Sequence, residues 1–218
     1  MTPFTRNTVA HGAGALAVAL CALALSGCNA LRPATATPPA FYALNSQANV
    51  ATPPVRVDPQ RKLPTLIITP PRAASGFDSQ RIIFVRKDHQ LEYFSHSEWV
   101  DPPARMLGPL MAAALENTGA FAAVVVTPSS AAGDQRLDTE IVRLQHNFQT
   151  QPSRVQFTLR ATLVDDKTRQ VLAWQEFSDE VAAPSDTPQG GVTAANQVVQ
   201  RVLGKLAQFA AHAHDPKR

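Results

Sequence analysis

Cys28 is the side chain in this sequence whose surroundings point most directly to a chemical reaction. The chain has 218 residues and two cysteines, and the other one, Cys21, lies within an apolar run just before it. A cysteine thiolate is a nucleophile that can be oxidised or alkylated. Two interpretations are open at this point: an ordinary cysteine buried in a core, or a cysteine that carries a covalent modification.

The 27 residues before Cys28 are organised like a secretory signal peptide. Arg6 is the only Lys, Arg, Asp or Glu among the first 31 residues, and residues 12–25 consist of Gly, Ala, Leu, Val and Cys alone. These 14 residues are fewer than the ~18 or more that a membrane-spanning helix needs. A basic start, a short apolar core and small residues before the cut therefore predict a cleaved signal peptide over 1–27.

The four residues Leu25, Ser26, Gly27 and Cys28 resemble the bacterial lipobox, in which a lipid is attached to the cysteine and the chain is cut just before it. The resemblance implies that Cys28 becomes the mature N-terminus, with its thiol in a diacylglyceryl thioether. Several acyl chains, such as palmitate, anchor a protein stably where a single chain does not. In Gram-negative lipoproteins an aspartate after the cysteine would suggest inner-membrane retention. Because Asn29 stands there, we expect the periplasmic face of the outer membrane.

The mature chain would have 191 residues, since 27 of the 218 are removed. Removal of Arg6 leaves 19 basic residues against 17 acidic ones, a net charge of about +2, with no basic run to favour nucleic acid. We expect a lipidated N-terminus and Pro/Ala/Thr tether over 28–40, one domain over 41–211 and a polar tail over 212–218. No thiol would be left for a disulfide or a cysteine-based zinc site.

A search for catalytic and metal-binding patterns finds little. The sequence contains no G-x-S-x-G, no G-x-x-x-x-G-K-[ST] and no H-E-x-x-H. His89, His96 and His146 are scattered singly, so each is expected to be a surface or hydrogen-bonded histidine. His212 and His214 could chelate a metal weakly, but they lie in a polar tail. We therefore predict no enzyme, no metal and no cofactor apart from the covalent lipid.

The periodicity of apolar residues predicts an α/β domain close to α+β. Two stretches recur at helical spacing, one after Asp101, expected as the cap, with Pro102 at the first helical position, and one over 195–210. We expect a mixed sheet of about five or six strands with helices packed on it, and a bulge or twist near Arg143. Residues 41–44 are expected to form a first strand or a docked segment. Further strands are expected at 66–68, 81–86, 91–94, 121–126, 137–148, 155–163 and 171–181.

Read in order, several short motifs resemble the ABC-type transport auxiliary lipoproteins, the PqiC-like family. The similarity covers about 41–209, and its specificity lies in the order of the motifs. The residues that carry it, besides the lipobox, are Tyr42, Leu44, Asp78, Arg86, Tyr93, Trp99 and Pro102. The resemblance implies a single three-layer domain like the anticodon-binding and TolB N-terminal folds.

The same resemblance implies a non-catalytic adaptor of an MCE-type lipid transport system of the Gram-negative envelope. The expected partner is an MCE-domain protein, and copies of the chain could form a ring that matches its symmetry. Two other functions stay open: a lipoprotein that activates a cell-wall synthase through a TolB-like domain, and a periplasmic hydrolase. Trp99 likewise has two interpretations, as a core side chain over the sheet edge or as a partner-facing contact.

Overall fold

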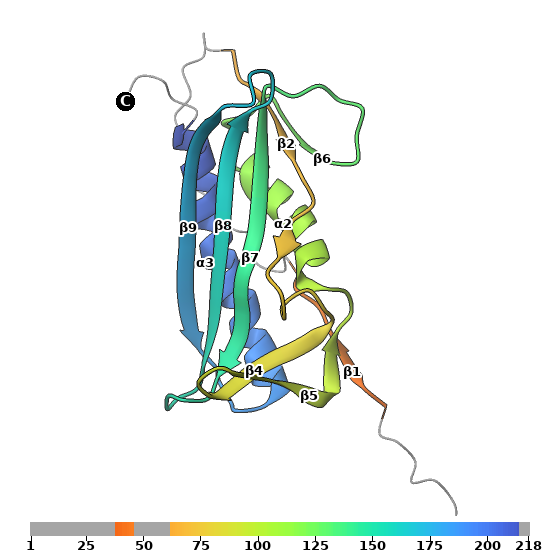
Figure 1. Cartoon of the computed structure of the whole chain (residues 1–218), viewed down its shortest axis with the longest axis vertical. Helices are drawn as coiled ribbons and strands as arrows, with labels where there is room; N and C mark the ends of the chain where they lie inside the picture. Colours follow the sequence, from red (N-terminus) through yellow and green to blue (C-terminus); the bar gives the residue numbers. More distant parts are fainter. Residues whose placement is uncertain (1–37, 46–61, 214–218) are drawn as a thin grey trace, which may run out of the picture. The chain divides into compact units, whose positions relative to one another are not determined.

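The computed structural model describes residues 38–45 and 62–213, and these residues form one mixed sheet with two helices (Figure 1). The signal peptide, the lipobox and most of the tether lie outside the described residues. The elements in chain order are β1 (Ala40–Tyr42), β2 (Thr65–Ile68), β3 (Arg72–Ala73), β4 (Arg81–Lys87), β5 (Gln90–Trp99), α2 (Pro103–Glu116), β6 (Ala123–Val126), β7 (Gln135–Asn147), β8 (Arg154–Asp165), β9 (Val171–Ala182) and α3 (Pro188–Ala213).

Strand β7 organises the sheet because both of its edges are paired. One edge pairs antiparallel with β8 along its length, and β8 in turn pairs antiparallel with β9. The other edge takes three short strands in succession, all parallel to it: β2 near the start, β3 in the middle and β4 at the end. Beyond these, β6 pairs with β2, β5 pairs with β4 and β1 pairs with β5. The β4–β5 hairpin and β1 are therefore held at the end of the sheet where β7 finishes (Figure 1).

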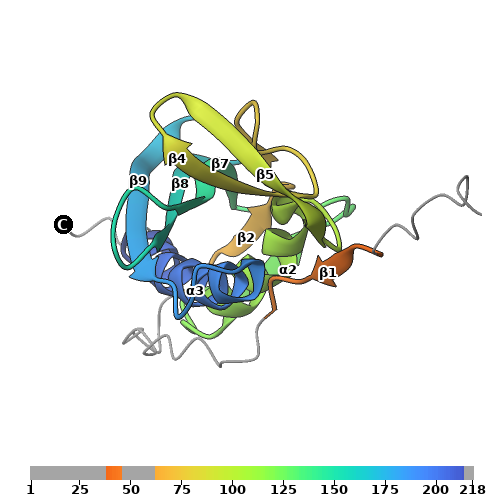
Figure 2. The ribbon, with the colours of Figure 1, turned by 90° about the horizontal axis from the view of Figure 1, so that it is seen from below.

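The two helices pack against the same face of this sheet (Figure 2). Phe177 of β9 packs edge-on against Phe209 of α3, and it is in register with Leu159 and Ile141 on the neighbouring strands. Thr139, on the same face of β7, donates a weak hydrogen bond to the sulfur of Met111 in α2. Since residues two apart on a strand share a face, one continuous core fills the space between sheet and helices.

The predicted fold class is confirmed, and its details differ in two ways. The sheet has nine strands where about five or six were expected. Eight of the nine lie at stretches that the sequence marked as strand candidates, and the ninth, β3, has two residues, too few to show a period. The described helices lie on one face of the sheet, so the described residues form two layers where three were expected (Figure 2). The predicted irregularity in β7 is confirmed: the pairing with β8 shifts between Ile141 and Arg143.

The start of α2 differs from the prediction by one residue. Pro102 is the N-cap and Pro103 the first helical residue, and no side chain caps the helix. Asp101, expected as the cap, instead forms an ion pair with Arg105, with 3.3 Å between Oδ1 and Nη1. A proline at the first helical position needs no hydrogen-bond partner for its nitrogen, so the Pro-Pro pair starts the helix without an acceptor side chain.

Candidate functional site

The described motif residues lie in β1, β4, β5 and the segments that join them to the core. Leu44 and Trp99 are 5% and 3% exposed, which places both in the core and favours the core interpretation of Trp99. Tyr42 is half-buried against the core and is in register with Trp99 across the β1–β5 pair. These three residues therefore hold the first described segment of the chain on the end of the sheet.

The remaining motif residues are at the surface of the same region. Arg86 forms a bidentate ion pair with Glu92 across the β4–β5 hairpin. The hydrogen bonds from Arg86 lower the pKa of the Glu92 carboxyl, and the carboxylate in turn raises the pKa of Arg86. Exposed ion pairs of this kind contribute little to stability, so this pair links the two strands of the hairpin at little gain in free energy. Asp78 is exposed in the turn before β4, and Pro102 caps α2.

A buried polar cluster joins three elements at this end of the domain. His146, at the end of β7, is 2% exposed, and its Nε2 lies 2.8 Å from the hydroxyl of Ser153, which is fully buried just before β8. The same hydroxyl donates to Oδ1 of Asp186, 2.5 Å away in the loop between β9 and α3. Because the hydroxyl has one proton and gives it to the carboxylate, it must accept its second bond from His146 Nε2–H.

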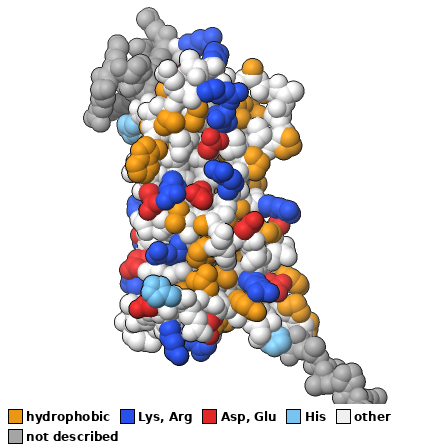
Figure 3. Space-filling model, viewed as in Figure 1, with side chains coloured by type: hydrophobic (Ala, Val, Ile, Leu, Met, Phe, Trp, Pro, Cys, Tyr) orange, Lys and Arg blue, Asp and Glu red, His pale blue; other side chains and the backbone are white. Residues whose placement is uncertain are grey.

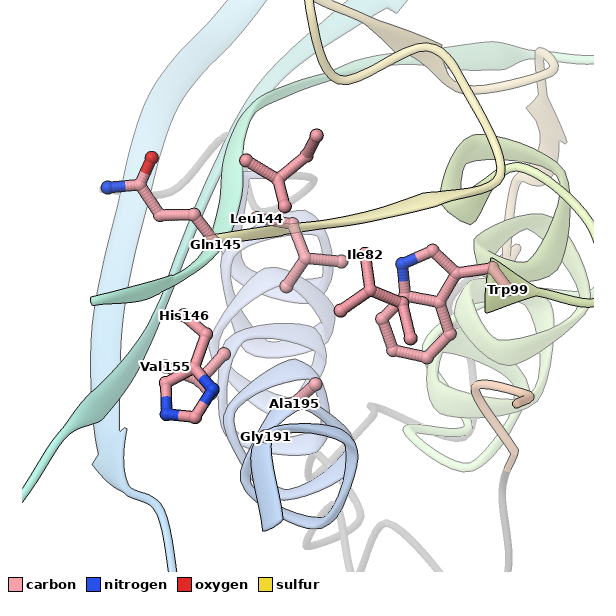
Figure 4. A pocket seen from close by; sticks show the side chains of 9 residues that line it. Ile82, Trp99, Leu144, Gln145, His146, Val155, Gly191 and Ala195 are labelled. Carbon is pink, nitrogen blue, oxygen red and sulfur yellow. The ribbon is translucent and has the colours of Figure 1, made fainter. Parts of the chain in front are cut away.

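The other ring nitrogen of His146 has no hydrogen-bond partner among the described residues. It faces α3 at Gly191, where an added Cβ would come within 2.6 Å of Nδ1. Figure 4 shows the imidazole at the edge of a small cavity whose lining is otherwise mostly apolar. The cavity has room for the centre of about one water molecule, close to 10 Å³, and is lined by Ile82, Ile83, Trp99, Leu144, Gln145, His146, Val155, Gly191 and Ala195.

This cluster contains the residue types of a hydrolytic triad in a different order. In a triad the histidine stands between the nucleophile and the carboxylate, and it takes the nucleophile's proton. Here Ser153 stands in the middle, directs its proton at Asp186 and is fully buried. Burial lowers the pKa of His146, and the charge of Asp186 opposes this only in part. The arrangement therefore fits a neutral histidine that joins β7, β8 and the start of α3.

From the sequence, His146 was expected to be an isolated surface or hydrogen-bonded histidine, and nothing predicted its contact with Ser153 or the link to Asp186. One available signal was its place in β7, two residues after Leu144 and in phase with the buried face. The partners come from a loop and from a segment 40 residues later, so no spacing in the sequence relates them.

A second hollow lies between β1 and α3 and is lined mainly by uncharged polar groups. Its lining residues are Phe41, Tyr42, Ala43, Asn45, Gln189, Val192, Thr193, Asn196, Gln197 and Gln200. Asn196 crosses it: its Nδ2 donates to the carbonyl of Ala43, and its Oδ1 accepts from the backbone N–H of Asn45. In this hollow the amide of Asn196 ties the segment after β1 to the helix.

Within residues 38–45 and 62–213, no three or more His, Cys, Asp or Glu side chains are grouped so that they could hold a metal ion. Among the same residues, no helix is both long and apolar enough to cross a membrane.

A family model described as the ABC-type transport auxiliary lipoprotein component matches residues 42–207. The chain belongs to this family. The match includes all the described elements from β2 to β9 and most of α3, so the auxiliary lipoprotein domain and the folded domain coincide. It also contains the whole His146, Ser153 and Asp186 cluster.

Two solved structures share the fold of the described domain. Protein XCC0632 from Xanthomonas campestris is 23% identical and has a TM-score of 0.69, covering 79% of this chain and 95% of that one. The hypothetical protein CT253 from Chlamydia trachomatis is 6% identical and has a TM-score of 0.51, covering 70% of this chain and 98% of that one. A PelC dodecamer from Paraburkholderia phytofirmans is 12% identical and covers 64% of this chain and 85% of that one, but its TM-score is only 0.39. No curated protein matches the chain.

Proposed function

We propose that this auxiliary lipoprotein is a non-catalytic adaptor of an MCE-type ABC lipid transport system. In this proposal it is anchored through lipidated Cys28 to the periplasmic face of the outer membrane and binds the MCE-domain protein of that system. The observation that carries the proposal is the family match over 42–207, which assigns the folded domain to a transport auxiliary component.

The position of the domain in the chain supports an anchored adaptor. The match begins 14 residues after Cys28, and the segment 29–40 would extend over at most ~35–40 Å at about 3.1 Å per residue. A domain on so short a tether must work close to the membrane that holds it. In the outer membrane it would meet an MCE protein that crosses the periplasm from the inner membrane. A ring of copies around that protein is part of the proposal.

The geometry of the buried cluster supports a role without catalysis. Ser153 is the described serine that a buried histidine and a carboxylate both contact, and its hydroxyl is fully buried and already committed to two hydrogen bonds. A nucleophile must reach its substrate and give its proton to a base. Ser153 is fully buried, and its proton is directed at Asp186 and not at His146, so the cluster is better suited to holding the fold than to hydrolysis.

The anchor is tested by replacing Cys28. In cells given a labelled fatty acid, the parent should incorporate the label, mature to the shorter chain and fractionate with the outer membrane. Cys28→Ser should incorporate no label and stay uncleaved or leave the membrane. Cys21→Ser is the matched control and should behave like the parent, because its thiol would be removed with the signal peptide. A Cys28→Ser chain that is labelled and cleaved normally would exclude the anchor.

The partner is tested with the purified mature lipoprotein in detergent and the ectodomain of the MCE protein from the same organism. The two should co-elute and cross-link at micromolar concentration, and the mass of the lipoprotein alone would show whether it forms a ring. The control is the ectodomain of an unrelated MCE system. Failure to associate, with both proteins folded, would refute the transport role. Binding to a cell-wall synthase in the same assay would favour the alternative function instead.

A further inference from the structure

Three neighbouring strands carry a row of exposed or half-buried side chains beside the point where the described chain begins. Phe41 of β1 is in register with Glu98 of β5, and Glu98 is in register with Arg81 of β4. Residues opposite one another on paired strands project to the same side of a sheet. Their neighbour Trp99 is buried, so this row lies on the face that points away from the core.

The row continues along the β4–β5 hairpin and into the segment after β5. The guanidinium of Arg81 lies 4.0 Å from the centre of the Tyr93 ring, and Leu91 is two residues from Tyr93 on the same strand. The N–H of Val100 donates to the carbonyl of Tyr42, which places Val100 beside β1. We call this set the β1–β5–β4 face, and its members are Phe41, Arg81, Leu91, Tyr93, Glu98 and Val100.

The apolar members of this face are unusually exposed. Phe41, Tyr93, Val100 and Leu91 are 58%, 51%, 49% and 46% exposed, and they make up half of the eight large hydrophobic side chains that are exposed in the described residues. Figure 3 shows hydrophobic side chains gathered with basic and acidic ones over the region of β1, β4 and β5. Exposed apolar groups collected in one area mark a surface that contacts something apolar.

The position of the chain's start identifies what this face would contact. The described chain begins at residue 38, three residues before Phe41, so the tether to the lipidated Cys28 enters the domain at the edge of this face. Three of the other exposed hydrophobics, Val171, Leu172 and Trp174, begin β9 and lie at the opposite end of the sheet. Of these two surfaces, only the β1–β5–β4 face adjoins the point where the described chain begins.

We propose that the β1–β5–β4 face docks on the lipid bilayer to which the tether is anchored. Its composition fits the membrane interface, where aromatic rings sit at the level of the headgroups and arginine keeps its charge in the polar layer while its stem contacts apolar surface. A second contact of this kind fixes the orientation of the domain and points the opposite end of the sheet, with Trp174, away from the membrane. The proposal rests on the lipid anchor at Cys28 but not on an MCE partner.

The test uses single cysteines, because lipidation of Cys28 leaves the mature chain without a free thiol. The lipidated full chain carrying Phe41→Cys or Leu91→Cys is labelled with an environment-sensitive fluorophore and reconstituted in phosphatidylethanolamine/phosphatidylglycerol vesicles. The matched control is Val171→Cys, which is 60% exposed at the far end of the sheet. Spin-labelled lipids should quench the labels at positions 41 and 91 at least about twofold more strongly than the label at position 171.

A second set of variants removes the contact without touching the labelled position. Phe41→Asp with Tyr93→Asp, in the Leu91→Cys chain, should reduce the quenching at position 91 to that of the control, while circular dichroism stays unchanged. Equal quenching in the Leu91→Cys and Val171→Cys chains without the Asp substitutions would overturn the proposal. A lipidated chain that does not float with the vesicles would overturn it as well, because the proposal rests on the anchor. Protection of position 91 that appears only after adding the MCE ectodomain would assign the face to a protein partner and overturn it as well.

Discussion

Replacing Ser153 with alanine tests whether the buried cluster holds the end of the domain together. Ser153→Ala removes a hydroxyl that accepts from His146 Nε2–H at 2.8 Å and donates to Asp186. It leaves the backbone unchanged, including the bond from the N–H of Ala183 to the carbonyl of Ser153. The effect of the substitution should therefore come from the side chains of His146 and Asp186 alone.

The expected loss of stability depends on the different exposure of His146 and Asp186. Asp186 is exposed, so water can replace the lost donor at little cost. His146 is 2% exposed and its Nδ1 already lacks a partner, so the variant would leave a buried donor and a buried acceptor unpaired. An unsatisfied buried polar group costs about 1–3 kcal/mol. For a chain of this size, this loss of stability lowers the melting temperature by roughly 2–12 °C.

The free energy of unfolding is measured by urea titration, with thermal melts as a second readout. The matched control is Ser129→Ala, which removes an exposed hydroxyl that accepts only from the backbone N–H of Ala131, 3.1 Å away in the loop after β6. Because solvent can reach that site, the control should stay within about 0.5 kcal/mol of the parent. If Ser153→Ala is no less stable than Ser129→Ala, the assignment of the cluster as a structural connection is wrong.

Three further predictions concern the same region. Burial lowers the pKa of His146 from its ordinary value of 6.5, so the unfolded chain binds the proton more readily than the folded chain. The contribution of His146 to stability should therefore be complete above about pH 6.5 and should fall below that pH by at most about 1.4 kcal/mol per pH unit. Urea titrations at pH 7.5 and 5.5 should show this decrease, and His146→Phe should abolish it. Trp99→Ala should cost about 3–5 kcal/mol in the same titration, whereas Trp174→Ala, at a site 67% exposed, should stay within about 0.5 kcal/mol, and equal effects would contradict the core assignment. Gly191→Ala should cost about 1–3 kcal/mol of stability, because its Cβ would lie 2.6 Å from His146 Nδ1. Gly108→Ala is the control and should be neutral or stabilising, because the nearest atom to its Cβ would be 3.9 Å away. A Gly191→Ala variant as stable as the parent would show that the imidazole can move.

The elements that the sequence predicted best are those with a clear local pattern. The alternation from Val155 to Leu163 predicted β8 nearly to its observed bounds, because every second side chain of that strand faces the same core. The apolar spacing after Pro103 likewise predicted α2. The break in alternation near Arg143 predicted the irregularity that the pairing of β7 with β8 contains. In each case neighbours in the chain supply the signal.

The sequence also assigned the chain to its family, because short motifs such as those around Tyr42 and Trp99 occur in a fixed order along the chain. The prediction of lipidation at Cys28 depends on four consecutive residues, and it remains a prediction because those residues lie outside the described part of the chain. Neither conclusion requires knowing which segments meet in space.

Tertiary structure decided what depends on contacts between distant segments. The pairing of β2, β3 and β4 with successive parts of one edge of β7 joins residues up to 69 positions apart, and the patterns of these short strands are compatible with many partners. Ser153 meets Asp186 across 33 positions, and Phe41 lies in one row with Arg81 across 40, although nothing near either pair in the chain marks the encounter. Local composition sets the preference of each segment, whereas the burial of a shared core selects which segments become neighbours, and only that selection creates the buried cluster and the exposed face beside the tether.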